Sequence, residues 1–322
     1  MDYITKDEII IFAPEFNKEL DINLLSNYKK IIFSNHELCD NLFDAYSNNN
    51  LKKIYYICSK FNQPVNYLPK NITHLSFGDS FNHPFNNLQQ SITHLSFGQH
   101  FNLPVNLLLP ILIHLTFGWN FNSPVNLLPL TLTHLSFSCK FNQCVNNLPP
   151  TLTHLSFGWN FNLQVNLLPP TLTHLSFGNC FNFPVNSLPP TLTHLSFGSC
   201  FNQPCDLPSS VKYLRLNCNN NYLINNLPNG VEELKLGCSF NLELNNLPNG
   251  VKKIIFEYYS CYNKDLNSLP NFLEYLELPL GYDKKILNIP SKLKKIKCSQ
   301  NYKFGEHFTN TDIDIEFIDQ YW

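Results

Sequence analysis

The chain has 322 residues, a formal net charge of −2 and eleven cysteines, and 43% of its residues are hydrophobic. A near-neutral charge without clustered lysines or arginines disfavours nucleic-acid binding. No apolar stretch approaches the roughly 20 residues that span a bilayer, so no membrane partner is expected. An odd number of scattered cysteines and a start without a secretory signal predict reduced thiols and a cytoplasmic location, in the host cytoplasm if the protein is viral.

Residues 1–70 are predicted to form degenerate N-terminal turns and a cap of a repeating coil. The apolar segments IIIF from Ile9, YKKIIF from Tyr28 and LKKIYY from Leu51 each resemble the strand of a unit that is clearer further along the chain. Between Ser34 and Leu51, apolar residues at helical spacing predict a short helix with Asn35 as its cap.

Residues 71–205 hold seven near-identical units of 20 residues. Numbered from Leu152 as position 1, the unit LTHLSFGWNFNLQVNLLPPT has apolar residues at positions 1, 4, 6, 10, 14 and 17. Its L-x-x-L-x-F start predicts one short strand. Prolines in its second half predict an extended return rather than a helix.

The remaining chain keeps the same pattern with looser sequence. Residues 206–298 are predicted to be divergent repeats, and residues 299–322 a C-terminal cap that includes DIDIEF from Asp312. We therefore predict one solenoid over residues 1–322, a β-rich, leucine-rich-repeat-like right-handed coil of about fifteen turns of about 20 residues. Its concave face would be a parallel sheet and its convex side extended or irregular.

The sequence motifs of the repeat resemble those of a known family. Phe101, Asn102, Pro104 and Val105, together with the recurring LTHLSFG, are similar to the FNIP repeat, a leucine-rich-repeat-like family known mainly from amoebae and the giant viruses that infect them. The resemblance implies a solenoid with a role in protein interaction. Some relatives carry an F-box ahead of the repeats, which implies service as substrate receptors in ubiquitin ligases. Residues 1–50 instead match degenerate repeats, so no F-box is expected there.

Position 3 of the unit is a histidine and position 5 a serine or threonine. Both alternate with inward leucine and phenylalanine, so they should form an outward strip in which neighbours lie about 4.8 Å apart. The histidines are His74, His94, His114, His134, His154, His174 and His194. Adjacent imidazoles at this spacing could share a metal ion such as zinc. The simpler interpretation is a surface residue copied with its unit, because no acid or cysteine completes a ligand set.

We assign no metal site and no cofactor, and keep metal binding or pH sensing by the histidine ladder as an alternative function. Protonation of stacked histidines predicts a loss of stability below about pH 6. Asparagines at position 11, such as Asn162, are predicted to pair backbone groups of neighbouring turns, and Asn162→Ala to cost about 1–3 kcal/mol. Serines beside the histidines lack an orienting acid, so no catalytic residue is predicted and the protein is not expected to be an enzyme.

Positions 8 and 9 vary most between units. Trp119 and Trp159 stand there, two turns apart, and tryptophan is favoured at binding hot spots. We predict a protein-interaction scaffold that contacts an unidentified partner protein, a host component if the chain is viral, through the concave sheet and the variable rim. The predicted partner-binding residues are Trp119, Trp159, His134, His154 and His174. A structural rod is a further alternative, and the oligomeric state is not indicated.

Overall fold

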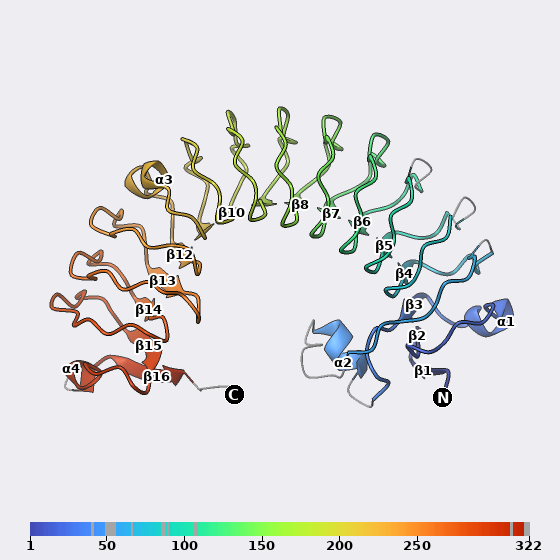
Figure 1. Ribbon diagram of the computed structural model, residues 1–322, viewed down its shortest axis with the longest axis horizontal. Coiled ribbons are helices and arrows are strands. Elements are labelled where there is room, and N and C mark those ends of the chain that lie inside the picture. The colour runs from blue at the N-terminus through green and yellow to red at the C-terminus, as the bar shows by residue number, and fades with distance from the viewer. Residues whose placement is uncertain are drawn as a thin grey trace. The chain divides into compact units, whose positions relative to one another are not determined.

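The computed structural model describes residues 1–39, 42–48, 56–65, 67–84, 88, 90–105, 109–309 and 312–318. The chain divides into two compact units, residues 1–158 and 159–322, which are described separately below. Both are β-solenoids, in which each turn contributes one short strand to a parallel sheet and returns along an extended path (Figure 1). In the described part of the chain no helix is both long and apolar enough to cross a membrane.

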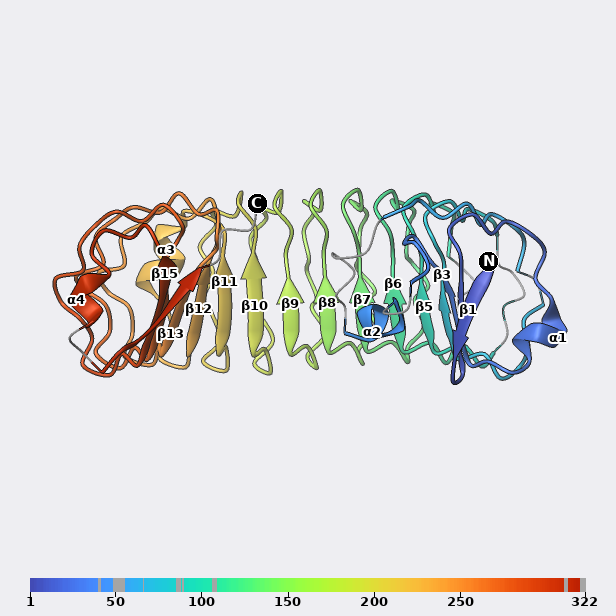
Figure 2. The ribbon, with the colours of Figure 1, turned by 90° about the horizontal axis from the view of Figure 1, so that it is seen from below.

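The first unit begins with a hairpin and continues as a parallel sheet. Strand β1 pairs antiparallel with β2, and β2 to β8 then pair in parallel in chain order, so that they lie side by side with one direction (Figure 2). Its strands are β1 (Tyr3–Lys6), β2 (Ile9–Phe12), β3 (Lys30–Phe33), β4 (His74–Ser76), β5 (His94–Ser96), β6 (His114–Thr116), β7 (His134–Ser136) and β8 (His154–Ser156). Two short helices, α1 (Ile22–Leu25) and α2 (Leu42–Ser47), interrupt the extended returns.

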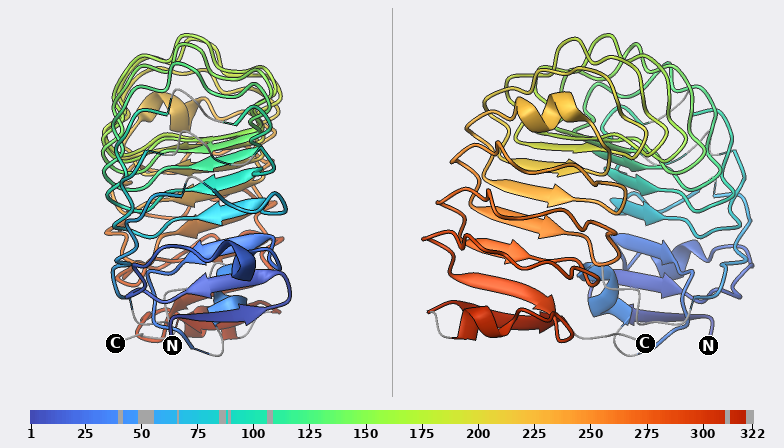
Figure 3. Two further views of the ribbon diagram at one scale, coloured as in Figure 1. Left: turned by 90° about the vertical axis from the view of Figure 1, so that its right-hand side faces the viewer. Right: turned by 60° about the vertical axis from the view of Figure 1, so that its left-hand side comes forward.

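The second unit is a parallel sheet throughout, with its strands paired in chain order. Its strands are β9 (His174–Ser176), β10 (His194–Phe197), β11 (Tyr213–Leu216), β12 (Glu233–Leu236), β13 (Lys253–Phe256), β14 (Tyr275–Glu277), β15 (Lys295–Ser299) and β16 (Asp314–Ile318). The short helices α3 (Asn221–Asn225) and α4 (Glu306–Thr309) lie in two of its returns. In the right-hand view of Figure 3 its strands lie side by side on one face of the coil, with the return segments on the other.

The interior of each turn is filled by side chains that stack on the same side chain of the next turn. Leu135 is 2% exposed and Phe141 is fully buried. The Phe137 ring lies 3.7 Å from Phe141 in its own turn and 5.5 Å from Phe117 in the preceding turn, measured between centroids. Such columns bury the apolar face that a single 20-residue unit leaves open to water. The predicted inward positions are confirmed.

A glycine follows the strand in most of the near-identical units because successive backbones approach closely there. A Cβ on Gly118 would lie 1.9 Å from the carbonyl oxygen of Gly98, and one on Gly158 would lie 1.8 Å from that of Ser138. Neither distance is compatible with a side chain. This packing explains why Gly recurs at position 7 although the backbone there needs no positive φ.

The segment between β3 and β4 departs from the repeat and covers part of the sheet. Helix α2 packs Leu42 and Phe43 onto Ile11 and Ile32 of β2 and β3. These two isoleucines occupy the outward position that is serine in β4, as the register Ile32↔Ser76 shows. An apolar residue on the outward face is thus buried by an apolar helix.

Asp79 connects this segment to the coil through hydrogen bonds. Its buried carboxylate accepts hydrogen bonds from the amide of Asn35 (3.0 Å), from the backbone N–H of Gln99 (3.2 Å) and from the hydroxyl of Tyr56. The Asn35 amide oxygen accepts in turn from the Asp79 N–H at 2.8 Å. Asn35 therefore holds the insertion against the coil, and the expectation that it caps a helix is wrong, because α2 begins at Leu42.

One further expectation needs correction. β3 pairs directly with β4, and Tyr56, the last residue of LKKIYY from Leu51, forms an isolated antiparallel bridge with His36 instead of a parallel strand; residues 51–55 lie outside the described residues. In the described residues the first unit has seven parallel strands and the second has eight, which agrees with the predicted coil of about fifteen turns to within one turn. At the other end, Asp314 and Glu316 pair with Lys295 of the preceding strand, so their charges are partnered within the sheet.

Candidate functional site

The most regular surface of the first unit is the outward face of β4 to β8. We call it the histidine strip. It comprises His74, His94, His114, His134 and His154 with the hydroxyl residues Ser76, Ser96, Thr116, Ser136 and Ser156. Its histidine side chains are half-buried, as expected for residues that stand side by side on a sheet. The predicted outward orientation of positions 3 and 5 is confirmed.

Neighbouring imidazoles of the strip are stacked face to face. The ring centroids of His134 lie 3.9 Å from His114 and 4.0 Å from His154, with interplanar angles of 14° and 13°. In the second unit His174 stacks on His194 at 3.9 Å, and His194 stacks on Tyr213 at 4.2 Å. The rings are closer than the strand spacing because they tilt onto one another, which shields each face from water.

A threonine at position 2 anchors most of these rings. The Thr93 hydroxyl lies 2.9 Å from His94 Nδ1, and the Thr133 hydroxyl lies 2.8 Å from His134 Nδ1. The same contact orients His74, His154, His174 and His194. His114 is the exception, because Ile113 precedes it. This anchor was missed in the sequence, although the recurring Thr-His pair is its visible signal.

The threonine hydroxyl also reaches the backbone of the preceding turn. The Thr93 hydroxyl donates to the Thr73 carbonyl at 3.2 Å, and that carbonyl also accepts the N–H groups of Thr93 (2.9 Å) and His94 (3.1 Å). The same hydroxyl lies 2.9 Å from His94 Nδ1. Nδ1 is therefore engaged by the threonine in either tautomer, and Nε2 is the ring nitrogen left for other partners.

The strip consequently presents the Nε2 edges of its imidazoles. Parallel rings direct their Nε2 atoms along parallel lines, whereas the ligands of a metal ion converge on one point. Among the residues that the structure describes, no three His, Cys, Asp or Glu side chains converge on a point where an ion could sit.

Burial and neighbouring histidines together disfavour protonation of the strip. Burial, followed by the charges of His74 and other neighbours, lowers the pKa of His94 to about 4, and burial with the charges of His114 and His154 lowers the pKa of His134 to about 4. The strip is thus neutral at physiological pH. pH sensing by the histidine ladder stays a prediction.

A pocket of about 260 Å³ lies where the strip meets α2 in the first unit. It is lined by Lys30, Ile31, Ile32, Tyr46, His74, Leu75, Ser76, His94, Leu95, Ser96, His114 and Thr116. Lys30 precedes His74 in the same column, since the two are paired in register. Its charge contributes to the lowered pKa of His74 and His94, which places the ammonium close to their rings. Lys30 was not among the predicted site residues.

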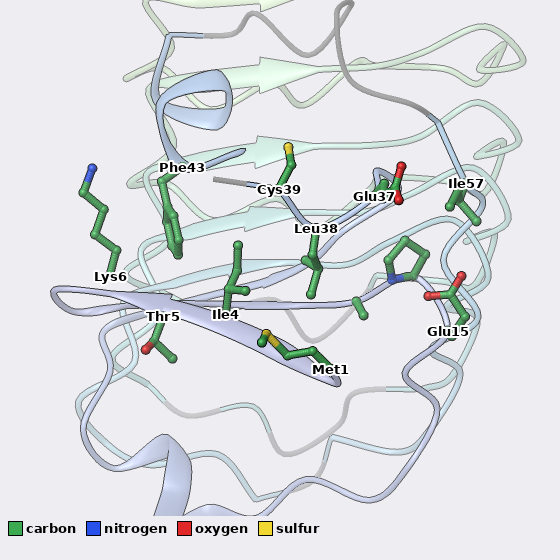
Figure 4. A pocket seen from close by; sticks show the side chains of 12 residues that line it. Met1, Ile4, Thr5, Lys6, Glu15, Glu37, Leu38, Cys39, Phe43 and Ile57 are labelled. Carbon is green, nitrogen blue, oxygen red and sulfur yellow. The ribbon is translucent and has the colours of Figure 1, made fainter. Parts of the chain in front are cut away.

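A larger pocket of about 830 Å³ lies beside β1 (Figure 4). Ile4 and Leu38 point toward one another across it, while Lys6 and Glu15 lie at its exposed edge. Lys6 is already paired with Asp44 at 3.3 Å. Binding sites generally combine an apolar wall with a few convergent polar groups. The smaller pocket at the strip meets this description better.

The predicted partner-binding residues lie in both units. Trp119, His134 and His154 belong to the first, and Trp159 and His174 to the second. Both tryptophans lie just past a strand and are exposed, Trp119 by 52% and Trp159 by 57%. His134 and His154 are neighbours in the strip at 4.0 Å. Their role in binding stays a prediction.

Comparison with known proteins identifies the repeat. The family model described as FNIP Repeat matches residues 61–100, 141–180, 182–219, 201–239 and 219–259. A comparison with curated protein sequences gives no match. The solved structure of CroV588, described as a novel circular LRR protein and coming from a giant virus, aligns with 98% of the chain at 34% identity and a TM-score of 0.75. The chain spans about half, 51%, of that protein.

Two other solved structures are more distant. YopM from Yersinia enterocolitica aligns with 80% of the chain and 78% of its own length at 16% identity and a TM-score of 0.33. A leucine-rich repeat protein from Bacteroides ovatus aligns with 98% of both chains at 13% identity and a TM-score of 0.23. These scores are too low to support an argument.

Proposed function

Because the chain carries FNIP repeats folded as a leucine-rich-repeat-like solenoid, we propose that it is a non-enzymatic scaffold that binds a partner protein. The binding surface comprises the histidine strip and the exposed tryptophans of the rim. The observation that carries the proposal is the strip itself, a continuous row of imidazoles and hydroxyls. Such a row of polar groups can exchange hydrogen bonds with a protein partner.

Two features support a binding role over catalysis. Nδ1 of His94 and of His134 contacts a threonine hydroxyl, whereas Nδ1 of the histidine in a catalytic triad contacts a carboxylate. Trp119 and Trp159 expose more than half of their surface, and exposed tryptophans are frequent binding hot spots. A cytoplasmic location belongs to the same proposal, and the free thiols of Cys205, Cys218 and Cys298 are compatible with a reducing compartment.

The test is a pull-down from a lysate of the native or host cell, followed by cross-linking of the captured complex. The binding variant replaces Trp119 and Trp159 by serine and His134, His154 and His174 by glutamine. The matched control replaces Leu127 and Leu167 by serine, because these residues expose 66% and 74% of their surface on the return side. Circular dichroism establishes that both variants are folded.

The proposal expects a protein that is captured by the wild type and by the control variant, cross-links to the strip, and is lost from the binding variant. Capture that is equal for all three proteins would contradict the proposed surface. Capture that the control variant alone loses would move the binding surface to the return side.

A further inference from the structure

The pocket between α2 and the histidine strip differs from the rest of the strip in carrying a full positive charge. Lys30 is half-buried there, and no carboxylate among the described residues forms an ion pair with its ammonium. The neighbouring Lys29 is paired with Glu8 at 2.6 Å, and on α2 Asp44 is paired with Lys6. The nearby acids are therefore already neutralised by other lysines.

The other polar groups that face this pocket are imidazoles and hydroxyls. Nδ1 of His74 and of His94 contacts a threonine hydroxyl, so Nε2 is the nitrogen that each ring offers to a ligand, and it donates a hydrogen bond when it carries the proton. Ser96 donates to the Ser76 hydroxyl at 2.8 Å, which leaves the Ser76 proton for an external acceptor. Tyr46, on α2, donates to Ser34 at 3.0 Å and forms a wall of the pocket. His114, the next residue of the column, has no threonine anchor and completes the titratable groups on this side.

We propose that this pocket binds a carboxylate side chain from an extended acidic segment of the partner protein, with Lys30 as the counter-ion and His74, His94 and Ser76 as hydrogen-bond donors. The inference rests on the proposed scaffold function and names the chemistry of its partner. A carboxylate accepts up to four hydrogen bonds, and in the complex Lys30, Ser76 and the Nε2–H groups of His74 and His94 would supply them. A volume of about 260 Å³ admits one such side chain and part of its backbone.

Binding of a carboxylate also changes the proton affinity of the imidazoles. A negative charge beside His74 and His94 favours their charged form and opposes the effect of burial and of Lys30. The complex therefore takes up protons, and the affinity rises as the pH falls from 7.5 to 6. A neutral peptide held by the same donors would show no such rise.

The experiment measures fluorescence anisotropy with three labelled peptides, hexa-glutamate, hexa-glutamine and hexa-lysine, on the full chain at fixed ionic strength. Hexa-glutamate is expected to bind best, and Lys30→Gln to weaken it about tenfold, as for loss of a close charge pair. Lys60→Gln, which removes an exposed lysine outside the pocket, should leave the affinity unchanged. The affinity for hexa-glutamate should increase about two- to threefold between pH 7.5 and 6.

Equal binding of hexa-glutamate and hexa-glutamine, or no effect of Lys30→Gln, would overturn the inference. Inorganic phosphate that competes as well as the peptide at matched ionic strength would reduce the site to one for simple anions and would also overturn it. Long-range proton–nitrogen spectra of the histidines give an independent readout, in which Nε2 of His94 must carry a proton in the hexa-glutamate complex. A partner still captured in the pull-down while hexa-glutamate fails to bind would leave the scaffold function standing and remove the acidic segment alone.

Discussion

The outward faces of the two units use the same backbone for different chemistry. In β4 to β8 of the first unit the outward residues are neutral histidines and hydroxyls. In β11 to β16 of the second unit most of them are charged and pair between strands, for example Lys253 with Glu233 at 3.1 Å and Lys295 with Glu316 at 2.7 Å, and the exceptions are Tyr213, Ile255 and Tyr275. Inward positions are leucine, isoleucine or phenylalanine in both. The fold thus depends on the inward columns and leaves the outward column free to vary.

The first test concerns the close packing of successive turns, which both units share. In Gly118→Ala of the first unit the new Cβ meets a carbonyl oxygen at 1.9 Å, so the backbones of two turns must separate. We expect a loss of about 3 kcal/mol of stability, measured by urea unfolding. The control is Gly281→Ala in the second unit, where no atom lies within 4 Å of the new Cβ, and a change of less than about 0.5 kcal/mol is expected. Equal effects would show that the close approach is not the reason for the glycine.

The second test compares how the outward faces of the two units respond to a change in pH. An unfolded histidine has a pKa of about 6.5, whereas burial holds the pKa of His94 and His134 at about 4 in the folded protein. The unfolded chain therefore binds more protons in this window, so stability is full above about pH 6.5 and decreases as the pH falls toward 4. Hydrogen bonds from lysines lower the pKa of Glu274 and Glu316, so β11 to β16 of the second unit should not respond there.

We expect the melting temperature to fall by several degrees between pH 7.5 and 5, and hydrogen exchange to accelerate in β4 to β8 before β11 to β16. A melting temperature that stays constant over this range would argue against the stacked, neutral strip. Faster exchange in both units together would instead indicate a general effect of acid.

The third test uses salt. Arg215 and Glu257 form an ion pair with N–O distances of 2.7 and 2.8 Å, and their side chains are 35% and 22% exposed. Glu257→Gln is expected to cost about 1 kcal/mol at low ionic strength and less in 1 M NaCl, because exposed and partly exposed pairs are screened. Ser136→Ala in the strip is the matched control and should show no dependence on salt. A cost that is the same at both salt concentrations would exclude a Coulombic origin.

The smallest effect is expected on the return side, where the units are alike. The Asn162 side-chain oxygen accepts the N–H of Asn182 at 3.0 Å, which confirms the predicted asparagine ladder. The bond is exposed, however, and water replaces it in a variant. Asn162→Ala should therefore cost about 0.5 kcal/mol rather than the 1–3 kcal/mol expected from the sequence. A loss above about 2 kcal/mol in thermal unfolding would indicate that the ladder is shielded from water.

Periodicity made the fold predictable from the sequence. A strict spacing of 20 residues places His134 beside His154 and Phe137 beside Phe117 without any knowledge of coordinates. The insertion after β3 was harder, because the only signals that α2 covers the sheet are isoleucines at positions that are serine elsewhere. The role of Lys30 at the site could not be predicted either. Lys30 reaches the strip only because β3 pairs with β4, which lies more than 40 residues later in the chain.

The contact between the threonine hydroxyl and the histidine Nδ1 was not accessible from the sequence. Between Thr93 and His94 it measures 2.9 Å. The sequence gives the threonine and the histidine as neighbours, and neighbours in a strand point to opposite faces of the sheet. Only the local geometry at the start of the strand brings their side chains together.

Repetition also creates a problem of register during folding. A strand that skips one unit and pairs with the next but one would meet the same leucines, phenylalanines, histidines and asparagines, with 20 residues looped out. Asp79 breaks this degeneracy, since it occurs once and binds Asn35, Tyr56 and Gln99 at defined places. The contacts with the N-terminal insertion thus fix the register of the first near-identical unit, and each later strand takes its register from the preceding strand.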